Sequence, residues 1–145
     1  PYSVLRPQFD PLSFSDDVLQ QALNSCAFWV RGNFVLQSRL LPLGPAIGHA
    51  RTFVLFLFQS LGVVHRSRLL HVYVGDDQVT PEVILMLLEQ VGKKTNEGWK
   101  LKVDDDKSFQ EKYPRYVPLH TEFWRKQVRR FGPLLERYRQ APQEN

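Results

Sequence analysis

The sequence has one cysteine, no long hydrophobic run and no leader of charged residues followed by apolar ones. A single thiol, Cys26, cannot form a disulfide within the chain, and this fits a reducing compartment. The longest apolar runs, residues 53–58 and 83–88, are far too short to cross a bilayer, so we expect no membrane association. The missing leader predicts no secretory signal, and the start at Pro1 suggests a piece of a longer polypeptide.

Residue clusters that carry catalysis or bind metal are also missing. The four histidines are spread singly along the chain: His49, His65, His71 and His120. The run Asp104–Asp106 lacks the spacing of a calcium loop and predicts a solvated acidic loop after a strand. Cys26 has no base beside it, and Gly44 and Gly48 lack the Lys-Ser/Thr of a phosphate loop. We therefore expect no enzymatic activity, no cofactor and no metal site, with Cys26 in the core.

What the sequence does contain is typical of a globular protein. Its 145 residues are 43% hydrophobic and 23% charged, enough to bury a sizeable core. The net charge of +4 and the pI near 9.4 make the chain mildly basic. This charge is too low to indicate nucleic-acid binding by itself.

Residues 49–103 carry the strongest local signals. Thr80-Pro81-Glu82 is a helix start, with a hydroxyl cap, proline at the first position and a carboxylate in the first turn. Gly92 is expected to end this helix in the left-handed conformation, and residues 99–103 form a strand that alternates apolar and basic residues. Upstream, the pattern predicts a helix over residues 50–61, a short strand at 63–64 and a helix over 66–73. This order of elements is typical of a winged helix-turn-helix.

The flanking segments are predicted from weaker patterns. Residues 1–15 predict an extended arm that packs its apolar side chains on the body: Tyr2, Leu5, Phe9, Leu12 and Phe14. Ser15 is expected to cap a helix over residues 17–28, followed by a strand over 34–36 and a proline- and glycine-rich loop over 42–48. Toward the C-terminus we expect helices over 109–113, 119–131 and 134–139, and a frayed end over 141–145.

An internal repeat links the two halves of this pattern. An offset of 65 positions aligns Val18 with Val83, Leu19 with Ile84, Leu23 with Leu88, Cys26 with Val91, Phe34 with Trp99 and Leu36 with Leu101. The sequence therefore predicts a mainly α fold with small β wings (α+β), made of tandem winged-helix units and a C-terminal helix. The expected divisions are an arm (1–15), a first, incomplete unit with its linker (16–48), a second unit (49–103) and a helical extension (104–145).

The side chains expected on the surface indicate whether the chain is suited to bind nucleic acid. The predicted helix over residues 80–92 offers Glu82 and Glu89, which phosphate repels. Because apolar residues occupy most of its circumference, we expect protein to cover nearly all its sides. The equivalent helix of the first copy is expected to expose Gln20, Gln21 and Asn24, which are more typical of an ordinary helix surface than of base contacts. The candidate contacts to phosphate or to an acidic partner are Arg125, Lys126, Arg129, Arg130, Arg137 and Arg139, with Lys100 and Lys102 on the predicted wing. A solvated helix face explains the same arginines equally well.

Several short motifs are more particular. Leu23-Asn24-Ser25-Cys26, Val30–Val35, Gly98-Trp99 and Phe123-Trp124 together resemble the C-terminal extension of the fifth specific subunit of eukaryotic RNA polymerase III. The resemblance runs from about Asp16 to Tyr138, and Phe34 stands where that family usually has tryptophan.

The resemblance implies tandem winged helices in a nuclear protein. It implies a non-catalytic interaction module for assembly, stability or regulation of the polymerase in transcription of small RNA genes. The partners it implies are other polymerase III subunits and assembly or transcription factors, with no catalytic residue to carry over. The alternative is a winged-helix DNA- or RNA-binding domain that makes weak, non-specific contacts through its basic residues.

Overall fold

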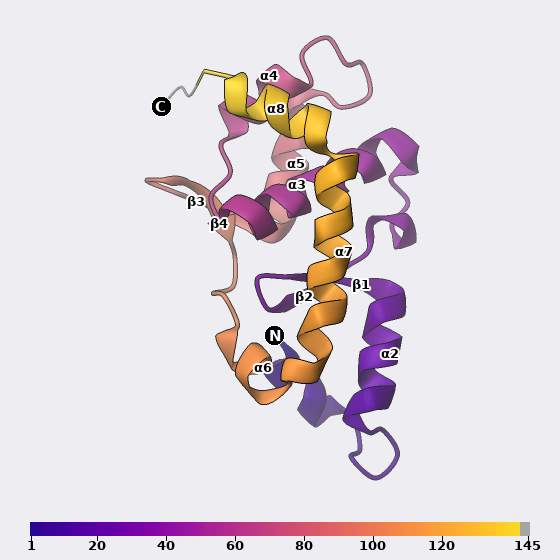
Figure 1. The fold of residues 1–145 in the computed structure, drawn as a ribbon. Helices are drawn as coiled ribbons and strands as arrows, with labels where there is room; N and C mark the ends of the chain where they lie inside the picture. The colour runs from indigo at the N-terminus through magenta and orange to yellow at the C-terminus, as the bar shows by residue number, and fades with distance from the viewer. Residues whose placement is uncertain (143–145) are drawn as a thin grey trace.

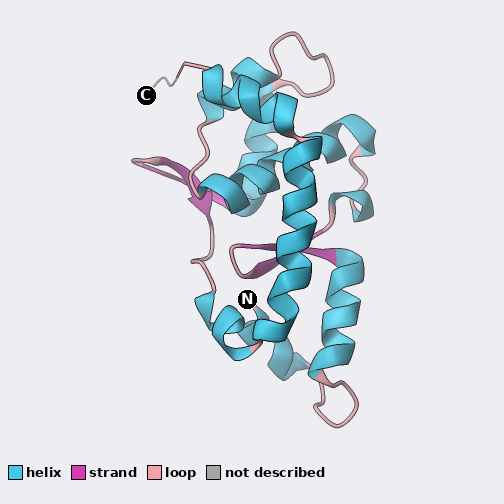
Figure 2. Cartoon of the chain, in the orientation of Figure 1, coloured by secondary structure: helices cyan, strands magenta, loops and turns pink. Residues whose placement is uncertain are grey.

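The structure, a computed structural model, describes residues 1–142 and is built mainly of helices (Figure 1 and Figure 2). The helices are α1 (Tyr2–Leu5), α2 (Asp16–Cys26), α3 (Gly44–Leu61), α4 (Arg66–Val72), α5 (Pro81–Val91), α6 (Lys107–Lys112), α7 (Val117–Arg130) and α8 (Gly132–Gln140). Short 3-10 turns cover Arg6–Gln8, Ser38–Leu40 and Pro114–Tyr116. The strands form two antiparallel hairpins, β1 (Ala27–Val30) with β2 (Asn33–Leu36) and β3 (Gly92–Thr95) with β4 (Gly98–Leu101). The predicted class, mainly α with small β wings, is confirmed.

The elements from α3 to β4 follow the order predicted for a winged helix. The Thr80 hydroxyl accepts a hydrogen bond from the Val83 N–H at 3.3 Å, so the predicted cap of α5 is present. The predicted short strand is a single bridge, in which Val64 and Trp99 exchange two backbone hydrogen bonds of 2.8 Å. This bridge joins the chain after α3 to the β3–β4 hairpin.

Gly92 corrects the prediction of a left-handed helix end. Its φ of −124° is extended, and the residue begins β3 directly after α5. A Cβ at this position would lie 2.9 Å from the Leu88 carbonyl oxygen and 3.0 Å from that of Lys100. Glycine is therefore required by the close approach of two backbones and not by a positive φ.

The internal repeat is reproduced element by element. The bounds of α2, β1 and β2 recur 65 positions later as those of α5, β3 and β4. The hairpin registers also agree, since Ala27 faces Leu36 as Gly92 faces Leu101. The helix predicted over residues 17–28 ends earlier, at Cys26, because the chain turns extended at Ala27 and pairs with β2.

The first 15 residues do not form an extended arm. They fold into α1 and a 3-10 turn, and of the five apolar side chains expected to pack on the body only Tyr2 is buried. Its ring lies 5.3 Å from Phe109 and 5.1 Å from Tyr113, whereas Leu12 is 95% exposed. Contacts with the distant segment around α6 therefore fix the start of the chain, and no local pattern indicates them.

Two boundaries predicted from proline and glycine are also wrong. The expected loop over residues 42–48 contains the first turn of α3, because Pro45 lies at the start of the helix, where its fixed φ suits the helix and its missing N–H costs nothing. Ala141 was expected to fray but is buried, and its N–H donates to the Arg137 carbonyl at 3.1 Å. The rest of that prediction, residues 143–145, lies outside the described residues.

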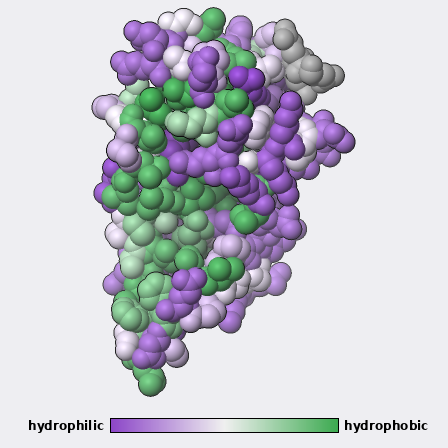
Figure 3. Space-filling view, turned by 180° about the vertical axis from the view of Figure 1, so that it is seen from behind, coloured by the Kyte–Doolittle hydropathy of each residue, from purple (hydrophilic) through white to green (hydrophobic). Residues whose placement is uncertain are grey.

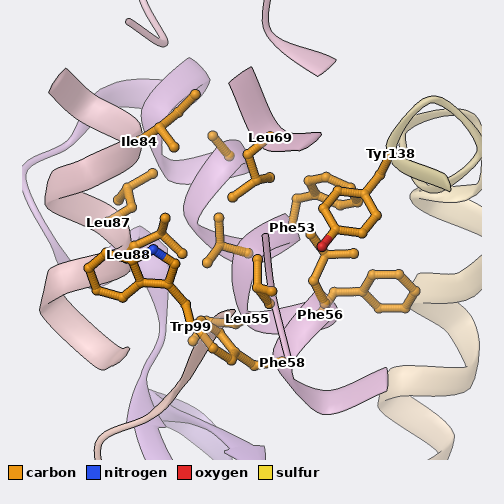
Figure 4. Packing of buried hydrophobic residues seen from close by; sticks show 14 of the residues in the cluster. Phe53, Leu55, Phe56, Phe58, Leu69, Ile84, Leu87, Leu88, Trp99 and Tyr138 are labelled. Atoms are coloured by element: carbon orange, nitrogen blue, oxygen red, sulfur yellow. The ribbon is translucent and has the colours of Figure 1, made fainter. Parts of the chain in front are cut away.

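The main core is built around α3 (Figure 4). Residues 53–58 of this helix are all buried, so the helix is covered on every side over this stretch. The side chains that surround it come from α4, α5, the β3–β4 hairpin and the C-terminal helices: Leu69, Ile84, Leu87, Leu88, Trp99, Phe131 and Tyr138. A second, smaller cluster contains Tyr2, Leu19, Trp29 and Phe109.

Helices α7 and α8 contact the first copy of the repeat and the helices that precede the second copy. Figure 1 shows α7 running along the molecule in front of α3 and of the β1–β2 hairpin. The indole N–H of Trp124 donates to the Trp29 carbonyl oxygen at 2.6 Å, which ties α7 to β1. The Tyr138 hydroxyl accepts the His65 N–H at 2.9 Å, which ties α8 to the start of α4. Helices α7 and α8 are therefore part of the core.

Candidate interaction surface

The outward face of α5 combines acidic and apolar residues. Glu82, Glu89 and Gln90 are exposed, and Met86 is 45% exposed, so the prediction that protein covers nearly all sides of this helix is wrong for the described chain. The Gln90 side-chain oxygen accepts from Arg51 Nε at 2.7 Å. In a winged helix that reads DNA this position carries basic or amide side chains, and two carboxylates there oppose phosphate.

The equivalent helix of the first copy, α2, offers less than the sequence predicted. Gln20 is buried, with its side-chain oxygen 3.4 Å from His120 Nε2. Gln21 is exposed and Asn24 is half-buried. The expected row of three exposed amides is therefore absent from the described chain, because α7 covers one of them.

His120 is a core residue. Its ring stacks on Trp29 at 5.4 Å between centroids and meets the Phe34 ring at 5.7 Å. Burial lowers the pKa of His120 to about 4, so the ring is neutral at pH 7. Among residues 1–142, no group of three or more His, Cys, Asp or Glu side chains is placed to hold a metal ion. No helix of this part of the chain is long and apolar enough to cross a membrane.

The predicted basic contacts are distributed over three elements. Arg125, Lys126, Arg129 and Arg130 are exposed on α7, and Arg137 and Arg139 are exposed on α8. Arg125 forms an ion pair of 2.6 Å with Glu122, which partly neutralises it. Lys126, Arg129 and Arg130 form no ion pair with the described residues. These three make α7 the main basic element of the surface.

The wing lysines lie apart from this helix. In Figure 1 the β3–β4 hairpin projects from one edge of the molecule, whereas α7 runs along its centre. Lys100 forms a 2.8 Å ion pair with Glu97, and this hydrogen bond lowers the pKa of the Glu97 carboxyl. Lys102 is exposed just beyond β4. The structure therefore does not gather all the predicted basic residues into one patch.

A groove of about 1040 Å³ lies between α4, α5 and the β3–β4 hairpin. Its apolar lining includes Leu70, Leu85 and Trp99. Its polar lining includes Arg66 and Ser67, whose buried Nε and Oγ atoms have no hydrogen-bond partner among the described residues. A concave, partly apolar surface with open donors is suited to contact with another macromolecule.

A family model described as the RPC5 protein matches residues 3–131. The chain belongs to the RPC5 family. This is the family of the fifth subunit of RNA polymerase III, so the resemblance found in the sequence motifs is confirmed at the level of the family. No curated protein matches the chain. RPC5 is an accessory subunit of the polymerase, and membership implies a role in transcription in the nucleus.

Part of the surface of the molecule is apolar. The view from behind in Figure 3 shows a band of hydrophobic residues along one side of the molecule. Of the first-copy elements, Val18 is 46% exposed, and Leu36 and Leu40 are each 43% exposed. Apolar groups gathered on a surface are typical of sites that contact another protein.

One junction of the chain was not predicted from the sequence. The acidic run Asp104–Asp106 is a loop in which Asp104 and Asp105 are exposed, as predicted, but its backbone also docks on the turn between β1 and β2. Asn33 Nδ2 donates to the Asp104 carbonyl at 3.0 Å, and the Asp106 N–H donates to the Arg31 carbonyl at 2.9 Å. Arg31 also pairs with the Asp105 carboxylate at 3.4 Å. The only sequence signal for this junction was the Arg-Gly-Asn turn at residues 31–33. Its Arg31 lies 74 residues before its partner Asp105.

Proposed function

We propose that this chain is a non-catalytic protein–protein interaction module of RNA polymerase III. It acts in assembly, stability or regulation of the polymerase during transcription of small RNA genes, in the nucleus. The observation that carries the proposal is the outward face of α5. This face presents Glu82, Met86 and Glu89 at the place where a DNA-reading winged helix presents donors to phosphate and bases. A mixed acidic and apolar helix face is suited to a protein partner.

The partners proposed are other polymerase III subunits and assembly or transcription factors. We also propose the division into an N-terminal segment (1–15), a first winged-helix unit with linker (16–48), a second unit (49–103) and a helical extension (104–145). The place of this chain in the C-terminal extension of the subunit belongs to the same proposal. Neither active-site residues nor a cofactor form part of it.

A second candidate is weak, non-specific binding of nucleic acid. It is favoured by the exposed basic residues of α7 that form no ion pair with the described chain, Lys126, Arg129 and Arg130. Arg137, Arg139 and Lys102 would add to this contact. Phosphate binding releases counterions, so the logarithm of the affinity would fall linearly with the logarithm of the salt concentration.

The test is an affinity capture from nuclear extract with this chain, with and without nuclease, read by mass spectrometry. Polymerase III subunits retained after nuclease treatment are the expected result. Met86→Glu should reduce their recovery, whereas the double change Lys126→Gln and Arg129→Gln should leave it unchanged. Recovery that collapses with nuclease, or that depends on Lys126 and Arg129 and not on Met86, would establish the second candidate instead.

A further inference from the structure

A second groove, of about 640 Å³, lies between α7, the start of α3 and the 3-10 turn at Ser38–Leu40. We call it the α3–α7 groove. Phe28, Leu41 and Pro45 provide its apolar lining, and Arg39, His49 and Arg130 provide its basic lining. No aspartate or glutamate of residues 1–142 lines it. The groove therefore differs from the one beside α4, where Glu89 and Glu97 also contribute.

The basic side chains of this groove have no acidic partner among residues 1–142. Arg39 Nε donates to Gln37 Oε1 at 3.0 Å, and its Nη2 donates to the Ser25 carbonyl oxygen. Arg130 Nη1 lies 3.4 Å from Gln127 Oε1. All three acceptors are neutral amide oxygens, and neither arginine forms an ion pair with the described chain. Arg39 keeps its Nη1 donors for a carboxylate, and Arg130 keeps Nε and Nη2, which can bind a carboxylate through two parallel hydrogen bonds.

Two of these basic groups also lie on the same aromatic ring. The His49 ring is 5.1 Å from the Phe131 ring, and the Arg130 guanidinium lies 5.0 Å from its centroid. Burial and the nearby Arg130 charge lower the pKa of His49. The His49 ring is therefore mainly neutral at pH 7, and it can donate a ring N–H to an anion held by the arginines.

The backbone at the start of α3, beside the groove, also carries partial positive charge. No side chain of the described residues caps the start of α3, and its first turn has no acidic residue. Gly44 and Gly48 line the groove without a side chain. The first N–H groups of a helix have no partner within the helix and carry a partial positive charge, so they add to the attraction that the two arginines exert on an anion.

We propose that the α3–α7 groove binds an acidic segment of a partner protein. A carboxylate of that segment lies between Arg39, His49 and Arg130, and an apolar side chain next to it packs on Phe28, Leu41 and Pro45. The proposal rests on the interaction function proposed above. A peptide is favoured over nucleic acid because apolar side chains line the groove beside the basic ones, whereas a sugar–phosphate backbone offers charge alone along its length.

The direct test uses a fluorescent peptide of alternating glutamate and leucine as the probe, with fluorescence anisotropy as the readout. A matched peptide carries glutamine in place of glutamate, and single-stranded and duplex DNA of equal length serve as competitors. We expect Arg130→Glu and Arg39→Glu to weaken binding of the acidic peptide by about tenfold or more. Arg129→Glu makes the same change of charge on the adjacent residue of α7, which does not line the groove, and should change binding less than about twofold.

Three outcomes would overturn the inference. They are equal binding of the glutamine peptide, equal loss with Arg129→Glu and Arg130→Glu, and displacement of the peptide by DNA at lower concentration than by unlabelled peptide. Arg130→Gln, with circular dichroism and thermal unfolding compared with the wild type, guards against a folding defect. The capture from nuclear extract separates the two proposals. If wild type and Arg130→Glu recover polymerase subunits equally after nuclease, the groove is not the docking site, although the interaction function stands.

Discussion

Trp99 closes the core from the side of the β3–β4 hairpin. The residue is 8% exposed and its backbone pairs with Val64. We expect Trp99→Ala to lower the free energy of unfolding by about 3–5 kcal/mol, because truncating a buried aromatic leaves a cavity. Urea denaturation measures this loss. Met86→Ala, at a residue 45% exposed, is the control and should cost less than about 1 kcal/mol. A loss below about 1 kcal/mol for Trp99→Ala would contradict the place of this hairpin in the core.

His120 makes the stability depend on pH. The unfolded chain binds its proton near pH 6.5 and the folded chain near pH 4, because the ring is buried against Trp29 and Gln20. Between these values the unfolded state binds more protons, so stability present above pH 6.5 is lost as the pH falls toward 4. The stability lost through His120 over this range is on the order of 3 kcal/mol, because each pKa unit is worth about 1.4 kcal/mol.

His120→Gln should remove this part of the pH dependence. The free energy of unfolding measured at pH 7 and at pH 4.5 should fall less in the variant than in the wild type. The carboxylates titrate in the same range in both proteins, so only the difference between the two proteins reports on His120. The exposed His71, changed to Gln, is the control. An unchanged slope in His120→Gln would show that the ring titrates normally.

At the scale of elements, the β1–β2 turn and the Asp104–Asp106 segment form one junction. Gly32 has a φ of +85°, and a Cβ there would lie 2.1 Å from the Asp106 carbonyl oxygen. Gly75 has a similar φ of +79°, but a Cβ there would meet no atom of the described chain within 4 Å, so this position separates backbone strain from the clash. We expect Gly75→Ala to cost about 1 kcal/mol and Gly32→Ala at least about 2 kcal/mol more in thermal or urea unfolding. Equal losses would mean that the acidic segment does not dock on this turn.

Elements with strong local signals were predicted well. The helix start at Thr80 and the Ser15 cap each follow from a residue acting on its own backbone neighbours. The failures have a shared cause. Pro45 permits a helix start as readily as a loop, and Gly92 serves a close approach as readily as a helix end. In both cases the residue type permits two local conformations and does not decide between them.

The candidate surface was predicted less well than the fold. The sequence predicted that Lys126, Arg129 and Arg130 would be exposed, but not that Lys100 and Arg125 are paired with glutamates. It also placed Gln20 on the surface, because a periodic pattern reveals which face of α2 meets its own hairpin but not that α7 returns to cover another. The α3–α7 groove was missed because its basic residues lie on three separate segments.

At the scale of the whole molecule, the main core joins both copies of the repeat. Val30 of β1, Trp99 of β4 and Trp124 of α7 belong to one cluster. We therefore expect a single cooperative unfolding transition. In the variant Trp99→Phe, tryptophan fluorescence reports on Trp29 and Trp124. In the double variant Trp29→Phe and Trp124→Phe, it reports on Trp99. Each signal should follow the same urea transition as the circular dichroism of the same variant. Two separate transitions within one variant would show that the copies fold independently.

The bond between Trp124 and the Trp29 carbonyl joins residues 95 positions apart. During synthesis α2 and the β1–β2 hairpin leave the ribosome long before α7, so the apolar faces that Phe123 and Trp124 cover stay open until α7 has been made. The contiguous elements α3, α4, α5 and the β3–β4 hairpin bury most of their own contacts as they emerge. Of these elements, α2 and the β1–β2 hairpin are therefore made first and complete their packing last.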